Sequence, residues 1–404
     1  MLVPVLVFVL VYVGMMLGRV PGLALDRTGV ALLGAVVLIA LGVVTPDEAW
    51  DSVDVPTIAL LLGLMVVSAQ FRLGGFYSVL TLRMASAPLG PRALLAAVLL
   101  LSASLSALLT NDIICLAMTP LLAEGCSRRG LNPLPYLLAL ACGANIGSAA
   151  TLVGNPQNIL IGQALQVSFA GYLLQALVPV ALSLLAAWLV LSDQYAGKWS
   201  AQSQLADVTH PPYSAWQSMK GLAILGAAVF VFLVPVVPRE VAALAAAGAV
   251  LVSRRMHTRE MLGLVDWQLL VLFCGLFVVN HAFAACGALG ALMEGLAGVG
   301  IALDSPAWLF GVVAVLSNLV SNVPAVMMLL PAATHEDAAL ILALASTLAG
   351  NLIVVSSIAN IIVIEQARQC GLKIGWGEHA RTGIPVTLAS LTIAAVWIAL
   401  LGTL

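Results

Sequence analysis

Long apolar runs recur along the whole of this 404-residue sequence, and they limit the possible folds more than any other feature. Many are about 17 to 25 residues long, the length that an α-helix needs to cross the hydrocarbon core of a bilayer. Charged residues make up only 8% of the chain, against about 25% in soluble domains, so the chain cannot cover a surface that faces water. The sequence therefore predicts an all-α polytopic membrane protein. No basic cluster indicates nucleic-acid binding, and we expect no cofactor and no metal site.

The sequence contains an internal repeat. Residues 54–75 align with residues 266–287 at a constant offset (266 − 54 = 212), and a GLxVV core is identical in both segments. The segment NDIICLAMTP at 111–120 aligns with NVPAVMMLLP at 322–331, and a third match pairs Asn158 with Asn360. Three matches in the same order indicate two copies of one unit. We predict a first repeat at 1–191, a polar cytoplasmic linker at 192–218 and a second repeat at 219–404.

Equivalent loops of the two repeats carry opposite charge. Residues 72–92 hold three arginines and no acid, whereas their counterpart, residues 284–305, holds two acids and no base. Arg128 and Arg129 likewise correspond to the acidic stretch 335–337. Because loops rich in Lys and Arg stay in the cytoplasm, the repeats are predicted to have inverted topology, an architecture of many secondary transporters.

Sidedness then predicts two re-entrant hairpins. Residues 93–126 lie between two basic segments, so they enter and leave the membrane on the cytoplasmic side, with Thr110, Asn111 and Asp112 at the tip. Residues 306–334 form the matching hairpin from the outside, with Ser321 and Asn322 at its tip. We count about ten transmembrane helices besides the hairpins. Asn111 and Asn322 are each expected to act as N-cap of the following helix.

Each hairpin precedes an apolar segment that is interrupted by helix breakers and polar residues. The first is residues 143–162, where Pro156 removes a helix donor, and the second is residues 349–363. Interrupted segments at matching places in both halves are the best pointer to a transporter's binding site, although small polar residues also serve helix packing. The predicted substrate-binding residues are Thr110, Asn111, Asn145, Ser148, Asn155, Asn158, Ser321, Asn322, Asn351, Ser356, Ser357 and Asn360.

Asp112 is the one carboxylate that the sequence places at membrane depth in this region. Ionisable residues inside a membrane usually mark an ion or proton path, so we interpret Asp112 as a proton-coupling residue. The alternative is an acid that stabilises the first turn of its helix. Asp54 and Asp266 precede their helices at equivalent positions and are interpreted as N-caps.

The predicted site offers amides, hydroxyls and a carboxylate, and no Lys or Arg lies in the tips or the breaks. A multiply charged anion is usually bound by Arg, so this composition favours a small polar solute that is neutral or balanced by a co-ion. An enzyme is not expected, because the sequence shows no paired carboxylates or nucleophile–base set at depth.

Three motifs resemble the ion transporter superfamily: LTND at 109–112, GNPQN at 154–158 and SNVP at 321–324. The nearest group is the ArsB-type arsenite efflux pumps and their ArsB-like relatives, and the divalent anion/sodium symporters are similar at greater distance. The resemblance covers nearly the whole chain. Val323 stands where the symporters have a hydroxyl.

The resemblance implies a static scaffold domain and a moving transport domain that together give alternating access. It implies that the two tips contact substrate, and that arsenite and antimonite are exported across the bacterial inner membrane in exchange for protons. Some members work with a soluble ATPase subunit, and a homodimer fits this class, although no motif indicates either. The alternative is proton- or sodium-coupled transport of a carboxylate or inorganic anion.

Overall fold

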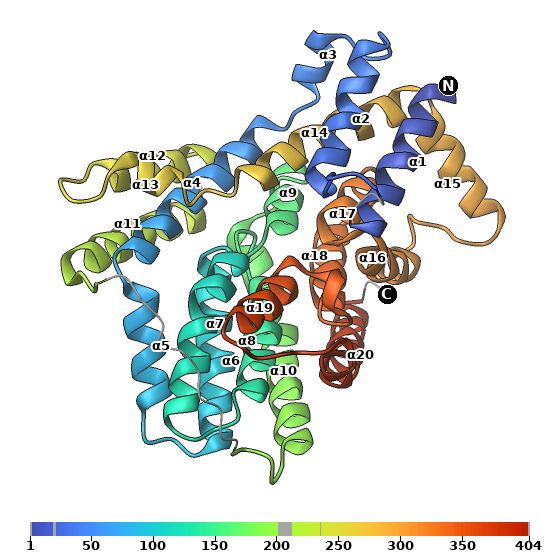
Figure 1. Cartoon of the computed structure of the whole chain (residues 1–404). Coiled ribbons are helices and arrows are strands. Elements are labelled where there is room, and N and C mark those ends of the chain that lie inside the picture. Colours follow the sequence, from blue (N-terminus) through green and yellow to red (C-terminus); the bar gives the residue numbers. More distant parts are fainter. Residues whose placement is uncertain (1, 19–21, 201–211, 235, 403–404) are drawn as a thin grey trace.

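The computed structural model describes residues 2–18, 22–200, 212–234 and 236–402, and these residues are predominantly helical (Figure 1). The first half contains α1 (Leu2–Leu17), α2 (Arg27–Ala40), α3 (Pro46–Asp51), α4 (Val55–Leu73), α5 (Phe76–Ser86), α6 (Pro91–Leu108), α7 (Asn111–Arg128), α8 (Pro133–Ser148), α9 (Pro156–Ala164) and α10 (Phe169–Gln194). The second half contains α11 (Ala215–Leu233), α12 (Arg239–Leu251), α13 (Thr258–Leu262), α14 (Trp267–Ala285), α15 (Ala288–Gly298), α16 (Pro306–Val320), α17 (Asn322–Leu329), η1 (Leu330–Ala332), α18 (Ala338–Ala349), η2 (Val354–Ser356), α19 (Ile358–Gln369) and α20 (Trp376–Leu400).

Six of the described helices are long and apolar enough by themselves to cross a membrane: α4, α6, α10, α11, α14 and α20. Shorter apolar helices include α1, α2, α16 and α18. The described residues form no β-strand and only one isolated β-bridge, between Leu131 and Ser200. The predicted all-α membrane fold is confirmed.

The two halves repeat the same order of helices, and two of the most extensive helix–helix contacts cross between them. Helix α4 packs along α12, and α14 packs along α2, so each half supplies one member of each pair (Figure 1). Gly63 of α4 and Gly275 of α14 lie at these crossings. A Cβ atom on Gly63 would lie 2.6 Å from the backbone carbonyl carbon of Ala243, and one on Gly275 would lie 2.8 Å from that of Ala31. Close approach of the backbones explains why glycine occupies both positions.

We name α1–α4 and α11–α14 the scaffold, and α6–α10 and α16–α20 the transport bundle. Two short helices, α5 and α15, connect them, each 11 residues long and each following a glycine in the left-handed conformation, Gly75 and Gly287. These helices correct the expectation that residues 72–92 and 284–305 are loops. In α5 the buried residues Tyr77, Thr81 and Ala85 recur every four positions, and α5 packs against α7.

Both hairpins form where the sequence places them. Only Leu109 and Thr110 separate α6 from α7, and only Ser321 separates α16 from α17. Asn111 and Asn322 are the first helical residues rather than N-caps, because the caps are Thr110 and Ser321, so that expectation was wrong by one position. Ser321 has φ +76°, an unfavourable value for a residue with a Cβ atom, so the second tip stores local backbone strain.

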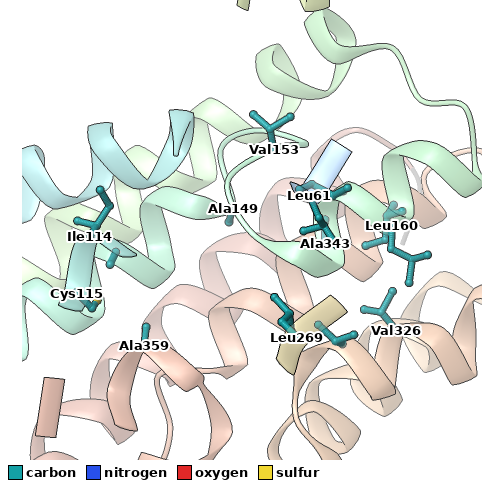
Figure 2. Packing of buried hydrophobic residues seen from close by; sticks show 14 of the residues in the cluster. Leu61, Ile114, Cys115, Ala149, Val153, Leu160, Leu269, Val326, Ala343 and Ala359 are labelled. Atoms are coloured by element: carbon teal, nitrogen blue, oxygen red, sulfur yellow. The ribbon is translucent and has the colours of Figure 1, made fainter. Parts of the chain in front are cut away.

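Both predicted helix breaks are present. Residues 149–155 separate α8 from α9, and residues 350–357 separate α18 from α19. Figure 2 shows Ala149 and Val153 of the first break within the buried apolar core, which also contains Leu61, Leu160, Val326 and Ala343 from four helices. Irregular backbone at membrane depth is therefore enclosed by protein, as the absence of water there requires.

The predicted linker, residues 192–218, lies partly outside the described residues. Its ends are helical, because α10 continues to Gln194 and α11 begins at Ala215. The division into domains at these boundaries stays a prediction.

Candidate functional site

The two hairpin tips and the two breaks converge on one small cavity. Its volume is about 30 Å³, enough for a water molecule or two. The lining residues are Asn111, Asp112, Asn145, Pro156, Gln157, Leu269, Ser321, Asn322, Val323, Thr347, Ser357 and Ile358. These residues come from both repeats, and Leu269 at the start of α14 adds the scaffold. The convergence that the paired motifs predict is therefore present in the structure.

Asn145, near the end of α8, is the centre of the hydrogen bonding around this cavity. Its Oδ1 accepts from Asn111 Nδ2 (3.3 Å) and from Ser357 Oγ (2.9 Å). Its Nδ2 donates to Asn351 Oδ1 (2.9 Å) and to Asn360 Oδ1 (3.1 Å). The side chain is only 2% exposed, so a single amide joins the first tip to the second break.

The contacts between the halves follow the pseudo-twofold relation. At the offset that pairs Asn158 with Asn360 (360 − 158 = 202), Thr347 is the counterpart of Asn145 and Ser357 is the counterpart of Asn155. Asn155 Nδ2 donates to Thr347 Oγ1 (3.1 Å), just as Ser357 Oγ donates to Asn145 Oδ1. Each break therefore bonds the helix before the other break.

Asn158 and Asn360 hold the two breaks in shape. Asn158 Nδ2 donates to the carbonyl oxygens of Ser148 (3.3 Å) and Thr151 (2.9 Å). Asn360 Nδ2 donates at the equivalent positions, to Gly350 O (2.8 Å) and Ile353 O (3.2 Å). These amides bond carbonyl groups of the breaks, of which Ile353 O also accepts from Ser356 N (3.2 Å), so their geometry is that of structural residues.

A second pair of residues anchors the same breaks from outside. The Tyr172 hydroxyl donates to Ala149 O (2.7 Å), and His379 Nε2 lies 3.2 Å from Asn351 O. Tyr172 and His379 are each the fourth residue of their helices, α10 and α20, and Ala149 and Asn351 are counterparts at the offset of 202. Because a carbonyl oxygen only accepts, His379 Nε2 must carry a hydrogen.

The second tip is fixed by its own amide. In the orientation that satisfies its hydrogen bonds, Asn322 Nδ2 donates to Ser346 O (3.1 Å) and Ser356 O (3.2 Å), and its Oδ1 accepts from Gln157 Nε2 (3.2 Å). Gln157 Nε2 also donates to Thr347 Oγ1 (3.2 Å). The start of α9, just after the first break, therefore contacts the second hairpin directly.

All twelve predicted binding residues are buried, but only part of the set reaches the cavity. Asn111, Asn145, Ser321, Asn322 and Ser357 line it. The other seven lie behind it, namely Thr110, Ser148, Asn155, Asn158, Asn351, Ser356 and Asn360. Among the described residues, Asn111 Oδ1 and Asn351 Nδ2 have no hydrogen-bond partner, so the network retains polar capacity beside the cavity.

Asp112 lines the cavity and is half-buried. Its carboxylate interacts electrostatically with that of Asp266, the N-cap of α14. The expected capping roles of Asp54 and Asp266 are confirmed, because their side chains accept from Thr57 N (2.9 Å) and Leu269 N (3.0 Å). Among the residues that the structure describes, no Lys, Arg or His lines the cavity.

Six residues that line the cavity were not among the predicted site residues, namely Pro156, Gln157, Leu269, Val323, Thr347 and Ile358. Gln157 lies within the GNPQN motif but was not singled out, and Thr347 could have been found by extending the Asn158–Asn360 match backwards to Asn145. Leu269 lies in α14 of the scaffold, far from the paired motifs in the sequence, so no local pattern indicates its place in the cavity.

Comparison with known proteins identifies the family. A family model described as citrate transporter, CitMHS, matches residues 8–349. The silicon efflux transporter LSI3 of rice, Oryza sativa subsp. japonica, is 30% identical over 462 residues, covering 95% of this chain and 94% of the relative. An uncharacterized transporter of Mycobacterium tuberculosis is 28% identical over 422 residues, covering 98% and 97%.

More distant relatives agree. A Dictyostelium discoideum protein that carries the name arsB is 22% identical over 502 residues, covering 94% of this chain and 88% of the relative. The crystal structure of the YdaH transporter of Alcanivorax borkumensis, described as having an unusual topology, matches with a TM-score of 0.63 at 16% identity, covering 99% and 97%. This structural match shows a shared fold. The resemblance to the ion transporter superfamily is supported, whereas the matches do not single out ArsB pumps. The chain, which combines this fold with a match over most of its length, belongs to the CitMHS citrate transporter family of secondary membrane transporters.

Proposed function

We propose that this transporter exports arsenite and antimonite across the bacterial inner membrane, in exchange for protons, by alternating access. One observation carries the proposal: the described residues that line the cavity between the tips supply amides, hydroxyls, apolar groups and one carboxylate, and none of them is basic. Arsenite is an uncharged trihydroxy species at neutral pH. Amide and hydroxyl groups can replace its hydration shell without a counter-charge. In this proposal Asn111, Asn145, Ser321, Asn322 and Ser357 contact the substrate.

The rice relative favours the same class of substrate. It is named a silicon efflux transporter, and silicic acid is also a neutral hydroxylated species at neutral pH. A site that accepts small neutral hydroxides therefore fits both the geometry and the direction of transport.

The family description favours a second candidate, a citrate or related carboxylate driven by protons or sodium. Citrate carries several negative charges, and proteins usually bind such anions through Arg. The tips offer only helix N-termini for this purpose, which can also bind anions. We therefore rank export of a neutral hydroxide first.

Asp112 is the proposed proton carrier. It lies at the first tip, beside the cavity, where a carboxylate can exchange a proton with the substrate path. Its repeat counterpart is Val323, so the pseudo-symmetry of the fold does not require an acid here. A homodimer and a soluble ATPase partner remain proposals without a structural feature behind them.

The test is uptake of radiolabelled arsenite, silicic acid (as germanic acid) and citrate into everted vesicles, with and without an imposed pH gradient. We expect gradient-driven uptake of arsenite by the wild type and loss of the gradient effect in Asp112→Asn. Asp54→Asn is the matched control, because Asn is as good an N-cap as Asp, so this variant should transport normally. Uptake of citrate alone would replace the substrate proposal. Gradient-driven arsenite uptake that persists in Asp112→Asn would remove only the coupling residue.

A further inference from the structure

A second, basic groove lies in the scaffold, away from the cavity of the tips. Its volume is about 660 Å³. It lies between the start of α11 and the segment that joins α12 to α13, and its lining residues are Trp216, Gln217, Lys220, Leu251, Val252, Ser253, Arg254 and Arg255. Three of these eight side chains are cationic.

The cations of this groove are available to a ligand. Arg254 and Arg255 are exposed and form no ion pair with any described residue. Lys220 Nζ donates to Val250 O (3.1 Å) and Val252 O (2.6 Å) at the end of α12, which leaves its third hydrogen free. The turn that presents the arginines is held by Ser253, whose Oγ accepts from Arg255 N and Met256 N.

The inverted repeat supplies an internal comparison. The equivalent groove lies between the start of α1 and the segment after α2, with a volume of about 380 Å³. At the offset of 212, Gly42 and Val43 stand where the basic groove has Arg254 and Arg255. The residues that line this equivalent groove near α1 are Leu2, Val3, Pro4, Val43, Val44, Glu48, His281, Ala282, Ala285 and Cys286, with no Lys or Arg among them. The fold therefore forms the groove on both sides, and only one copy has acquired guanidinium groups.

The difference in charge between the two grooves matches the difference in lipid charge between the two faces of a membrane. The charge pattern places the arginine-bearing groove on the cytoplasmic side, where the leaflet is rich in anionic lipids that attract basic segments. The membrane-facing surfaces that run on from the groove are apolar, with Met219 67% and Leu222 47% exposed on α11 and Leu244 43% exposed on α12. Trp216 lies at its edge and is 71% exposed, and Trp is typical of the membrane–water boundary.

We propose that this groove binds the phosphate headgroup of an anionic phospholipid, with the acyl chains lying along α11 and α12. Guanidinium groups bind phosphate oxygens in pairs, which suits Arg254 and Arg255. The groove also adjoins the turn between α4 and the connecting helix α5, because Gln70 Nε2 donates to Gln217 O (2.8 Å) and Ser214 N donates to Gly74 O (3.0 Å). A bound lipid therefore braces the scaffold where the chain turns towards the transport bundle.

The test is native mass spectrometry of the purified full-length protein titrated with phosphatidylglycerol or with phosphatidylcholine. We expect preferential retention of phosphatidylglycerol by the wild type, and roughly tenfold weaker retention by the double variant Arg254→Gln, Arg255→Gln. The matched control is Arg83→Gln, Arg92→Gln, which removes two exposed arginines from the same predicted side outside the groove. This control should retain phosphatidylglycerol like the wild type. A thermal melt of each variant in detergent verifies that it is folded.

Each alternative has its own outcome. Equal retention of the two lipids by the wild type, or equal losses in both double variants, would overturn a specific headgroup site and leave the arginines as topology signals alone. Displacement of phosphatidylglycerol by inorganic phosphate at similar concentration would assign the groove to a free anion instead. None of these results depends on which solute the tips transport.

Discussion

At the residue scale, the centre of the molecule is a set of buried amides that satisfy one another. Asn145 makes four side-chain hydrogen bonds, and they link the first tip, the second break and α19. Because the hydrocarbon core of a bilayer supplies no water, each of these groups depends on a protein partner or on the small cavity beside it. The set is therefore sensitive to single substitutions, and its members should fall into two classes, those that face the cavity and those that hold the breaks.

Asn145→Ala should abolish transport and destabilise the protein. The change leaves partners on three segments unpaired, and each buried unsatisfied group costs about 1–3 kcal/mol. Thermal unfolding in detergent and initial uptake rates measure the two effects. Asn132→Ala is the control, because Asn132 is the half-buried N-cap of α8, whose side chain accepts from Leu134 N and donates to the Lys198 carbonyl, away from the cavity. Its loss should cost about 1 kcal/mol of stability and leave transport intact. Wild-type transport by Asn145→Ala would show that the amide is not part of the site.

His379 should tolerate Gln but not Leu. Gln places an amide N–H near the position of His379 Nε2, so it can still donate to Asn351 O, whereas Leu cannot. Asn351 Oδ1 accepts from Asn145, so losing the anchor should disturb the site as well as the break. We expect near-normal uptake for His379→Gln and a reduction of about tenfold or more for His379→Leu, since a lost bond of about 1.4 kcal/mol corresponds to tenfold. Equal uptake by the two variants would show that transport does not depend on the hydrogen bond from position 379 to Asn351 O.

At the element scale, the internal repeat of the sequence predicts which segments form hairpins and helix breaks. It does not predict features that depend on the direction in which individual side chains point. The hairpins, the breaks and their meeting followed from the paired motifs around Asn111 and Asn158. The α5 helix was missed although Tyr77, Thr81 and Ala85 form a stripe, because its basic residues were used only to assign the side of the membrane. The roles of Asn158 and Asn360 were not separable from those of Asn145, because helical periodicity no longer fixes orientation after a break.

The scaffold crossings should depend on their glycines. In Gly63→Ala, the new Cβ atom would lie 2.6 Å from the Ala243 backbone, so α4 and α12 must move apart. We expect a loss of about 1–3 kcal/mol, typical of overpacking, measured by unfolding in detergent. Gly275→Ala should behave alike at the equivalent crossing.

Gly226→Ala is the matched control for both glycine variants. A Cβ atom at Gly226 in α11 meets nothing within 4 Å, and Ala favours a helix over Gly. This variant should be neutral or slightly more stable. Equal stability of Gly63→Ala and Gly226→Ala would mean that the crossing is not tightly packed in the membrane.

At the scale of the whole molecule, the two repeats are alike in fold but differ in how their arginines engage the transport bundle. Arg239, at the start of α12, donates through Nη2 to Gly162 O (3.0 Å) and Val167 O (2.9 Å) beyond the first break. Its counterpart Arg27 instead reaches Val355 O within the second break, at 3.5 Å. In inverted-repeat transporters, switching moves one bundle against the other around the site. If the repeats exchange their arrangements on switching, the contacts of Arg239 belong to one state, and Arg27 takes up equivalent contacts with the end of α19 in the other.

A disulfide that fixes α9 to α12 beside the contacts of Arg239 should therefore stop transport. Gln163 Nε2 donates to Glu240 Oε2 (3.1 Å), beside the Arg239 contacts, and this pair joins the transport bundle to the scaffold. In a variant without the six native cysteines, oxidation of Gln163→Cys, Glu240→Cys should reduce uptake at least tenfold, and reductant should restore it. Oxidation of Thr28→Cys, Gln268→Cys links α2 to α14 within the scaffold, where Thr28 Oγ1 donates to Gln268 O, and it should leave uptake intact. Full uptake through a cross-linked Gln163→Cys, Glu240→Cys protein would show that the bundle does not move at this interface, because a disulfide holds the two Cα atoms within about 7 Å.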